Sequence, residues 1–144
     1  MTETDRLIVY ADGGARGNPG PAAIGAVVVD PSTDPPTVVA TVSEAIGVTT
    51  NNVAEYRALI AGLEAALEHG ARRVEVRADS QLVVRQVLGE YRVKQAHLRP
   101  LCEDARRLLG EFDEVRMLHV PRAQNVDADA LVNAALDAEA GSAS

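Results

Sequence analysis

The sequence predicts an α/β domain in which a five-stranded mixed sheet carries helices on both faces. Three observations support this fold class. Three β-rich stretches follow one another within residues 7–46, the apolar spacing changes to a helical period from residue 52, and strand-like and helix-like stretches alternate from residue 74 onward. The resulting order, βββαβααβα, implies one sheet packed between helices.

The first three strands are predicted at residues 7–11, 22–29 and 37–46, and they suggest an antiparallel meander. The first is an apolar run that ends at Asp-Gly-Gly, and the turn-rich stretch PSTDPP separates the second from the third. A helix is expected from Asn52, because its apolar residues recur at helical spacing until Gly70 closes the segment.

The second half alternates strands with helices. Residues 74–79 alternate apolar and polar side chains, which is typical of a strand, and residues 80–88 read as a short helix. A helix over 95–109, a strand over 114–120 and a last helix that carries Leu131, Val132 and Leu136 complete the pattern. The lone Cys102 falls on the apolar face of the 95–109 helix, so we expect it to pack in the core.

Length and composition indicate one domain. The chain has 144 residues, and its 47% hydrophobic fraction is ample for a core. We assign residues 1–139 to the domain and 140–144, the small-residue end AGSAS, to a flexible tail or the start of a linker. No apolar stretch suits a membrane span and the start does not resemble a signal peptide, so we expect a cytoplasmic protein with no membrane partner.

Four carboxylates are expected to meet at one edge of the sheet. Asp12 and Asp79 end the first and fourth strands, and Glu55 and Asp129 lie in the first turns of helices. Each also has a structural alternative: Asp12 could shape a turn, Asp79 with Ser80 could cap a helix, Asn52 and Glu55 resemble a capping box, and Asp127 could take the place of Asp129.

A carboxylate cluster of this kind requires bound cations, because like charges about 4 Å apart repel by about 4 kcal/mol at an effective dielectric near 20. The sequence has no Cys/His spacing suited to zinc, whereas an all-oxygen cluster suits two Mg²⁺ ions, with Mn²⁺ as a substitute. The net charge of −7 argues against a broad basic surface for nucleic acid, although bound cations would offset part of it.

Four motifs, DGGARGNPGPAAIG, TTNNVAEYRAL, ADSQLV and NVDADAL, resemble type 1 ribonuclease H in order and spacing, over about residues 6–138. The resemblance implies the ribonuclease H-like fold, with an antiparallel first half of the sheet and parallel fourth and fifth strands. It also implies an endonuclease that hydrolyses the RNA strand of RNA–DNA hybrids with two Mg²⁺ ions and leaves 5′-phosphate and 3′-hydroxyl ends. The family pattern assigns catalysis and metal binding to Asp12, Glu55, Asp79 and Asp129, with Asp127 as the fallback for the last.

The resemblance also implies contacts with the hybrid. Uncovered glycine backbone after Asp12 can approach the RNA sugar edge and its 2′-hydroxyls, although a Gly-Asn-Pro-Gly segment is by itself typical of a turn. The residues implied to bind substrate are Gly13, Gly14, Gly17, Asn18, Thr50, Asn51, Asn52, Ser80, Gln81, Arg122 and Asn125.

Two departures from the family pattern bear on function. The stretch YRVKQAHLR has no Trp and is shorter than the basic protrusion of many members; its Arg92, Lys94, His97 and Arg99 could follow the DNA backbone or form a solvated face. Arg122 stands where many members have a loop histidine, and His119 is expected to be a strand residue.

Two alternatives to the hybrid-cleaving enzyme follow. One is a weakly active or inactive hybrid-binding module of a larger protein, and the other is a different nuclease of the same fold. We expect a monomer, with covalent fusion to a downstream domain as an option.

Overall fold

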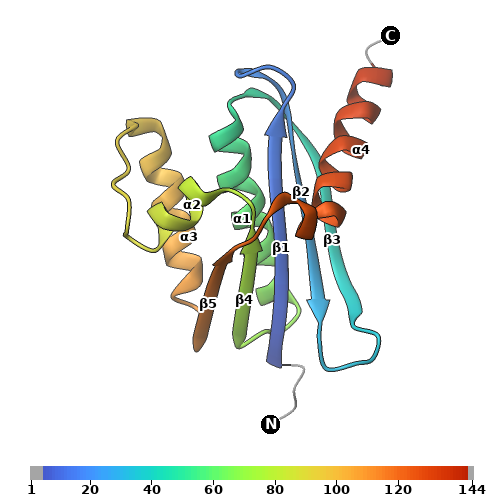
Figure 1. Cartoon of the computed structure of the whole chain (residues 1–144), viewed down its shortest axis with the longest axis vertical. Helices are drawn as coiled ribbons and strands as arrows, with labels where there is room; N and C mark the ends of the chain where they lie inside the picture. Colours follow the sequence, from blue (N-terminus) through green and yellow to red (C-terminus); the bar gives the residue numbers. More distant parts are fainter. Residues whose placement is uncertain (1–4, 143–144) are drawn as a thin grey trace.

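The computed structural model describes residues 5–142, and within it five strands form one mixed sheet in the order β3-β2-β1-β4-β5 (Figure 1). The strands are β1 (Arg6–Ala15), β2 (Gly20–Asp30), β3 (Thr37–Thr49), β4 (Arg73–Ala78) and β5 (Glu114–His119). β1, β2 and β3 pair antiparallel, whereas β4 pairs parallel to β1 and β5 parallel to β4. The predicted fold class is therefore confirmed.

Helices cover both faces of this sheet. The helices α1 (Asn51–Glu68) and α3 (Arg99–Leu109), with the short α2 (Gln81–Val87), enclose the main core on one face. α4 (Val126–Ser142) packs on the other face against β2, β3 and β1, over a smaller cluster that contains Ala23 and Val132 (Figure 1). Two short 3₁₀ helices, η2 (Ala96–Leu98) and η3 (Arg122–Gln124), precede α3 and α4.

The main core follows from the alternation along the central strands. Leu7, Val9 and Ala11 of β1 point toward α1, whose Tyr56, Leu59 and Leu63 are fully buried against them. Cys102 of α3 is buried in the same core, as predicted.

β1 is longer than predicted and changes the setting of Asp12. The strand does not end there but continues to Ala15, with Gly13 and Gly14 paired to Ile24 and Ala23 of β2. The parallel ladder between β1 and β4 ends at Ala11 and Ala78, so Asp12 is the first β1 residue beyond it. The predicted strand end was wrong because Gly13 and Gly14, although glycine usually signals a turn, continue β1 as a strand that pairs with β2 and no longer with β4.

Two helix starts also differ from the prediction. The N-cap of α1 is Thr50, whose hydroxyl accepts a hydrogen bond from the Val53 amide, so Asn52 and Glu55 do not form the capping box considered above. The predicted helix over 95–109 is divided into η2 and α3, because Pro100 lies in the first turn of α3 and lacks the amide hydrogen that a continuous helix would need.

The chain end is helical as far as Ser142, three residues into the segment expected to form a tail, while 143–144 and 1–4 lie outside the described residues. The boundary at residue 139 stays a prediction. Within residues 5–142, no helix combines the length and apolar character needed to cross a bilayer.

Candidate active site

Three of the four predicted carboxylates meet where β1, β4 and α1 converge. One oxygen from each of Asp12, Glu55 and Asp79 lies within 4.8 Å of the others. Asp12 is buried, and Glu55 and Asp79 are half-buried. Asp12 and Asp79 each follow directly on the last paired residues of the parallel β1–β4 ladder, which brings the two side chains to one edge.

Gly13 allows α1 to bring Glu55 to this edge. A Cβ atom at Gly13 would lie 2.3 Å from the carbonyl carbon and oxygen of Ala54 and 2.6 Å from the amide nitrogen of Glu55. Only a residue without a side chain permits this approach. Glu55 is the fifth residue of α1 and lies beyond the first turn in which we expected it.

Asp129 lies beside these three carboxylates. It belongs to the first turn of α4 and, with Asp12 and Glu55, lines a hollow of about 320 Å³. Asp127, the fallback, is exposed and does not line this hollow. The geometry therefore favours Asp129 as the fourth carboxylate.

The pKa values of two of these carboxyl groups are strongly raised. Burial, the negative charge of Asp79 and the neighbouring Asp129 raise the pKa of Asp12 to about 8. Burial also raises the pKa of Glu55 to about 7, with Asp79 adding to the rise while the Ser80 hydroxyl and Arg122 oppose it. Ionising the whole cluster is therefore unfavourable without a positive partner.

The donor set fits hard divalent cations. It consists of carboxylate oxygens, which Mg²⁺ and Mn²⁺ prefer, and contains no thiol or imidazole. Burial, together with the neighbouring carboxylates, disfavours the ionised forms of Asp12 and Glu55, and a bound cation would offset that cost.

Arg122 is one of the two arginines that line this hollow. Its Nε lies 3.8 Å from Oδ2 of Asp79, and its side chain is otherwise exposed. It extends from η3 over the hollow that Asp12 and Glu55 line.

The predicted substrate residues of the β1–β2 loop are connected to the start of α1. The side-chain oxygen of Asn18 accepts a hydrogen bond from the Asn51 amide at 3.1 Å, and that of Asn51 accepts one from the Ala15 amide at 2.8 Å. Gly17 adopts a φ of +98°, which favours glycine. These bonds hold the loop next to the hollow that Gly13, Gly14 and Asn51 also line.

The remaining predicted contacts fall into two groups. Thr50 and Ser80 cap α1 and α2, which confirms the capping alternative for Ser80, and Gln81 is exposed at the start of α2. Asn52 lines a separate hollow of about 460 Å³ with residues of α2 and of the connection to α3, including Arg92 and Lys94.

Asn125 differs from the prediction. It is only 1% exposed, and its Nδ2 donates a hydrogen bond to the Ala11 carbonyl at 2.9 Å. Burial leaves it no surface for the substrate contact that we expected. It instead fixes the start of α4, and so Asp129, next to β1.

The structure adds three residues that sequence reasoning missed. Arg16 lines the site hollow and pairs with Asp137 of α4 at 2.6 Å, and Asn133 donates a hydrogen bond to the Asp129 carbonyl. The helical spacing of Asp129, Asn133 and Asp137 could have indicated a shared face. Arg16 carried no comparable signal.

Comparison with known proteins identifies the family of this chain. A model of the reverse transcriptase-like family matches residues 10–135. The crystal structure of RNase H1 from Halobacterium salinarum superposes on this structure with a TM-score of 0.87 and 49% sequence identity. The match covers 92% of this chain and 98% of the RNase H1 chain. The chain belongs to the ribonuclease H family. A second ribonuclease H structure, LC11-RNase H1 in complex with an RNA/DNA hybrid, has a TM-score of 0.85 at 43% identity and covers 92% of this chain and 98% of that one.

The curated relatives of this ribonuclease H domain are longer proteins. The bifunctional protein Rv2228c of Mycobacterium tuberculosis is 49% identical over 138 residues, which are 96% of this chain but 37% of the relative. Ribonuclease HI of Halobacterium salinarum is 49% identical over 132 residues, which are 92% of this chain and 65% of the relative. The structure of the N-terminal RNase H domain of Rv2228c matches with a TM-score of 0.86 at 48% identity, covering 91% of this chain and 98% of that one.

Proposed function

We propose that this ribonuclease H domain hydrolyses the RNA strand of RNA–DNA hybrids, with two divalent cations held by Asp12, Glu55, Asp79 and Asp129. The observation that carries the proposal is the convergence of three carboxylates within 4.8 Å, with Asp129 beside them. The names of the relatives, Ribonuclease HI and an RNase H1 bound to an RNA/DNA hybrid, support the choice of substrate.

Asp12, Glu55, Asp79 and Asp129 would hold the cations, which would supply activation of a water and charge stabilisation of the leaving 3′ oxygen and so give 5′-phosphate and 3′-hydroxyl ends. The protein's own groups position them. Ser80 and Arg122 counter the pKa rise of Glu55, which favours its ligating, ionised form. Asn125 and Gly13 fix α4 and α1 against β1, so the carboxylates are held in place before any substrate arrives.

Substrate contacts would lie on both sides of this cluster. On one side, the loop held by Asn18 and Asn51 presents backbone groups that can test for 2′-hydroxyls. On the other, the hollow lined by Asn52, Arg92 and Lys94 offers a positively charged path for a phosphate backbone. Because Arg92 and Lys94 would contact phosphates, hybrid binding should weaken as the salt concentration rises.

A cleavage assay with matched variants tests the proposal. With Mg²⁺ or Mn²⁺, the wild type should cut the RNA strand of a labelled hybrid but neither double-stranded RNA nor double-stranded DNA, and EDTA should stop it. Asp79→Asn and Asp129→Asn should each lower the rate by at least about 10²-fold, since each removes a charged ligand. Asp127→Asn is the control and should cut at the wild-type rate, because Asp127 is exposed outside the hollow.

The same experiment separates the alternatives. A wild type that binds hybrid but never cuts it with either metal would make the chain a binding module. Cleavage of double-stranded DNA at a similar rate would favour a different nuclease of the same fold. End labelling and ligation of the products would show whether they carry 5′-phosphate and 3′-hydroxyl ends.

A further inference from the structure

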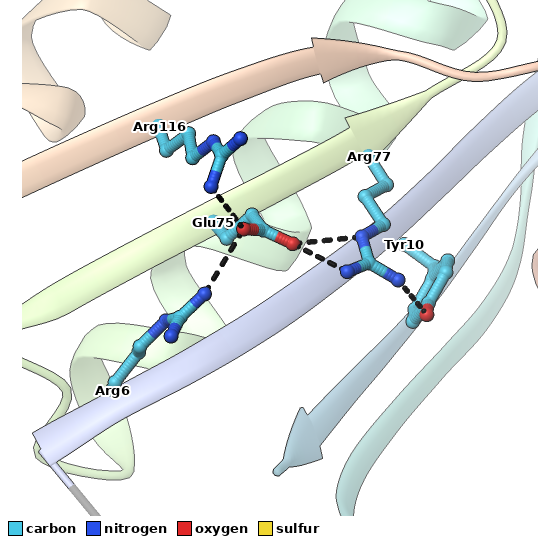
Figure 2. Close-up of polar contacts among 5 residues, drawn as sticks. All are labelled: Arg6, Tyr10, Glu75, Arg77 and Arg116. Atoms are coloured by element: carbon cyan, nitrogen blue, oxygen red, sulfur yellow. Dashed lines mark hydrogen bonds and ion pairs between the residues drawn. The ribbon is translucent and has the colours of Figure 1, made fainter. Parts of the chain in front are cut away.

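A buried glutamate gathers three arginines on the sheet face that also carries α4. Glu75 of β4 is 3% exposed, and its carboxylate pairs with Arg6 at 3.0 Å, Arg77 at 2.6 Å and Arg116 at 3.8 Å (Figure 2). Arg77 also donates a hydrogen bond to the Tyr10 hydroxyl at 2.6 Å. These residues come from β1, β4 and β5, which lie side by side in the sheet.

Positive charge exceeds negative charge in this cluster. Arg73, at the start of β4, takes part in no ion pair within residues 5–142, and its Nε is buried without a hydrogen-bond acceptor. Together with Arg6, Arg77 and Arg116 it makes four guanidinium groups. The hollow next to them is lined by three of these arginines, Arg6, Arg73 and Arg116, and by Glu75 and Glu114, which leaves an excess of one positive charge on its walls.

Two hollows open beside Arg6 and Arg73, and both residues line each of them. One, of about 300 Å³, also borders Glu75, Glu114 and Arg116, and the other, of about 390 Å³, borders Pro31 and Ser32. Asp30 precedes the second hollow but does not line it, and hydrogen bonds from Ser32 lower the pKa of its carboxyl group and keep it ionised.

The arginine cluster lies away from the carboxylate cluster. Arg6 and Arg73 are paired residues at the start of the parallel β1–β4 ladder, whereas Asp12 and Asp79 follow its end. Six residues of β4 at about 3.3 Å each separate the two ends by roughly 17–20 Å. The hybrid contacts proposed above involve α1, α2 and the β1–β2 loop, and none of them reaches the Arg73 end of the strands.

We propose that these hollows form an anion site in which Arg6, Arg73 and Arg116 bind a phosphate group. Guanidinium groups bind phosphate through paired hydrogen bonds, and the walls of the first hollow carry more positive than negative charge. The guanidinium of Arg73 has no carboxylate partner within residues 5–142, so its charge is available to an anion in the hollows that it lines. The room beside it is sufficient for an esterified phosphate, either a small phosphorylated molecule or a nucleic-acid backbone.

Phosphate binding can be measured on the full chain by NMR in EDTA, where the carboxylate cluster repels anions. Inorganic phosphate should shift amide signals at the starts of β1, β4 and β5 in a saturable way. Arg73→Ala should weaken binding by about tenfold, because it removes a charge-assisted donor pair. Arg116→Ala, whose side chain is 69% exposed and so dispensable for folding, should weaken it by at least about threefold.

Arg107→Ala is the matched control, because Arg107 is an exposed arginine of α3 that already pairs with Asp104. It should bind phosphate as the wild type does. The proposal is overturned if phosphate shifts no signals at the strand starts, if Arg73→Ala and Arg116→Ala both bind like the wild type, or if a glutamate peptide competes as well as phosphate does.

Two further ligands distinguish whether the phosphate belongs to a small molecule or to a nucleic-acid backbone. Thymidine monophosphate and a short oligothymidylate are titrated under the same conditions. Tighter binding of the oligonucleotide that Arg116→Ala removes would assign the site to a nucleic-acid backbone. Equal binding of the mononucleotide and the oligonucleotide would assign it to a small phosphorylated molecule. Because hybrid cleavage is measured separately and with metal, failure of this site would leave the proposed nuclease activity unaffected.

Discussion

The Gly13→Ala variant tests how the contact between β1 and α1 builds the site. The added Cβ would lie 2.3 Å from the backbone of Ala54. An ordinary contact begins at 3.4 Å, so α1 must retreat by 1.1 Å, the difference between the two distances. Because the obstructing atoms are backbone, no side-chain rotation can relieve the clash.

Two effects should follow from this retreat. Overpacking of this kind costs about 1–3 kcal/mol, and the rigid obstruction places Gly13→Ala toward the upper end. Glu55 would also move by about 1 Å relative to Asp12, and a displacement of that size costs about 10²-fold in rate. Urea unfolding measures the first effect, and Mg²⁺ affinity with the initial rate of hybrid cleavage measures the second.

Gly14→Ala is the matched control. It introduces the same methyl group one residue further along β1, where the nearest atom is 3.9 Å away on Val132. We expect its free energy of unfolding to change by less than about 0.5 kcal/mol. If Gly13→Ala is as stable as Gly14→Ala and binds Mg²⁺ as the wild type does, the close approach of α1 does not position Glu55.

Three further predictions concern charge. The pKa of Asp12 is raised to about 8 and that of Glu55 to about 7, so the Mg²⁺ affinity measured by calorimetry should increase from about pH 6 to pH 8, and binding should release protons. An affinity that does not change with pH would contradict this. In the folded protein Asp12 keeps its proton up to about pH 8, whereas the unfolded chain loses it near pH 3.8, so without metal this residue lowers the free energy of unfolding as pH rises between those values. In EDTA, Asp12→Asn should therefore be more stable than the wild type, by at least about 1 kcal/mol more at pH 9 than at pH 5. A stability difference that does not change with pH would refute the assignment. Glu75→Gln should lower the free energy of unfolding by about 1–2 kcal/mol, because the buried Glu75 carboxylate accepts charge-assisted hydrogen bonds from Arg6 and Arg77. Arg116→Ala should cost less than about 0.5 kcal/mol, and similar losses would show that burial of Glu75 does not matter.

The sequence predicted the fold well where the periodicity was unambiguous. Alternation in β4 and helical spacing in α1 located both elements, and the order of elements gave a mixed sheet. The sequence prediction failed where one residue has two structural roles. Gly13 was interpreted as part of a loop, although it continues β1 and admits α1, and only the packed structure shows that approach.

The sequence predicted the carboxylates of the candidate site, but it predicted the residues that hold them in place less well. The four carboxylates come from segments that the motifs marked, whereas Asn125 was assigned to the substrate because a sequence does not show that an amide is buried. The Arg16–Asp137 pair joins positions 121 residues apart, and the arginines around Glu75 come from three strands. Contacts between distant segments depend on strand register, which a single sequence leaves open.

The account rests most directly on cation binding by the carboxylate cluster, and paramagnetic broadening by Mn²⁺ measures it in the intact chain. Low Mn²⁺ concentrations should broaden NMR signals around Asp12, Glu55, Asp79 and Asp129, excess Mg²⁺ should restore them, and Asp79→Asn should abolish the effect at the same concentrations. If broadening is absent from these four positions, or unchanged in Asp79→Asn, the cluster is not a metal centre and the proposed mechanism is wrong.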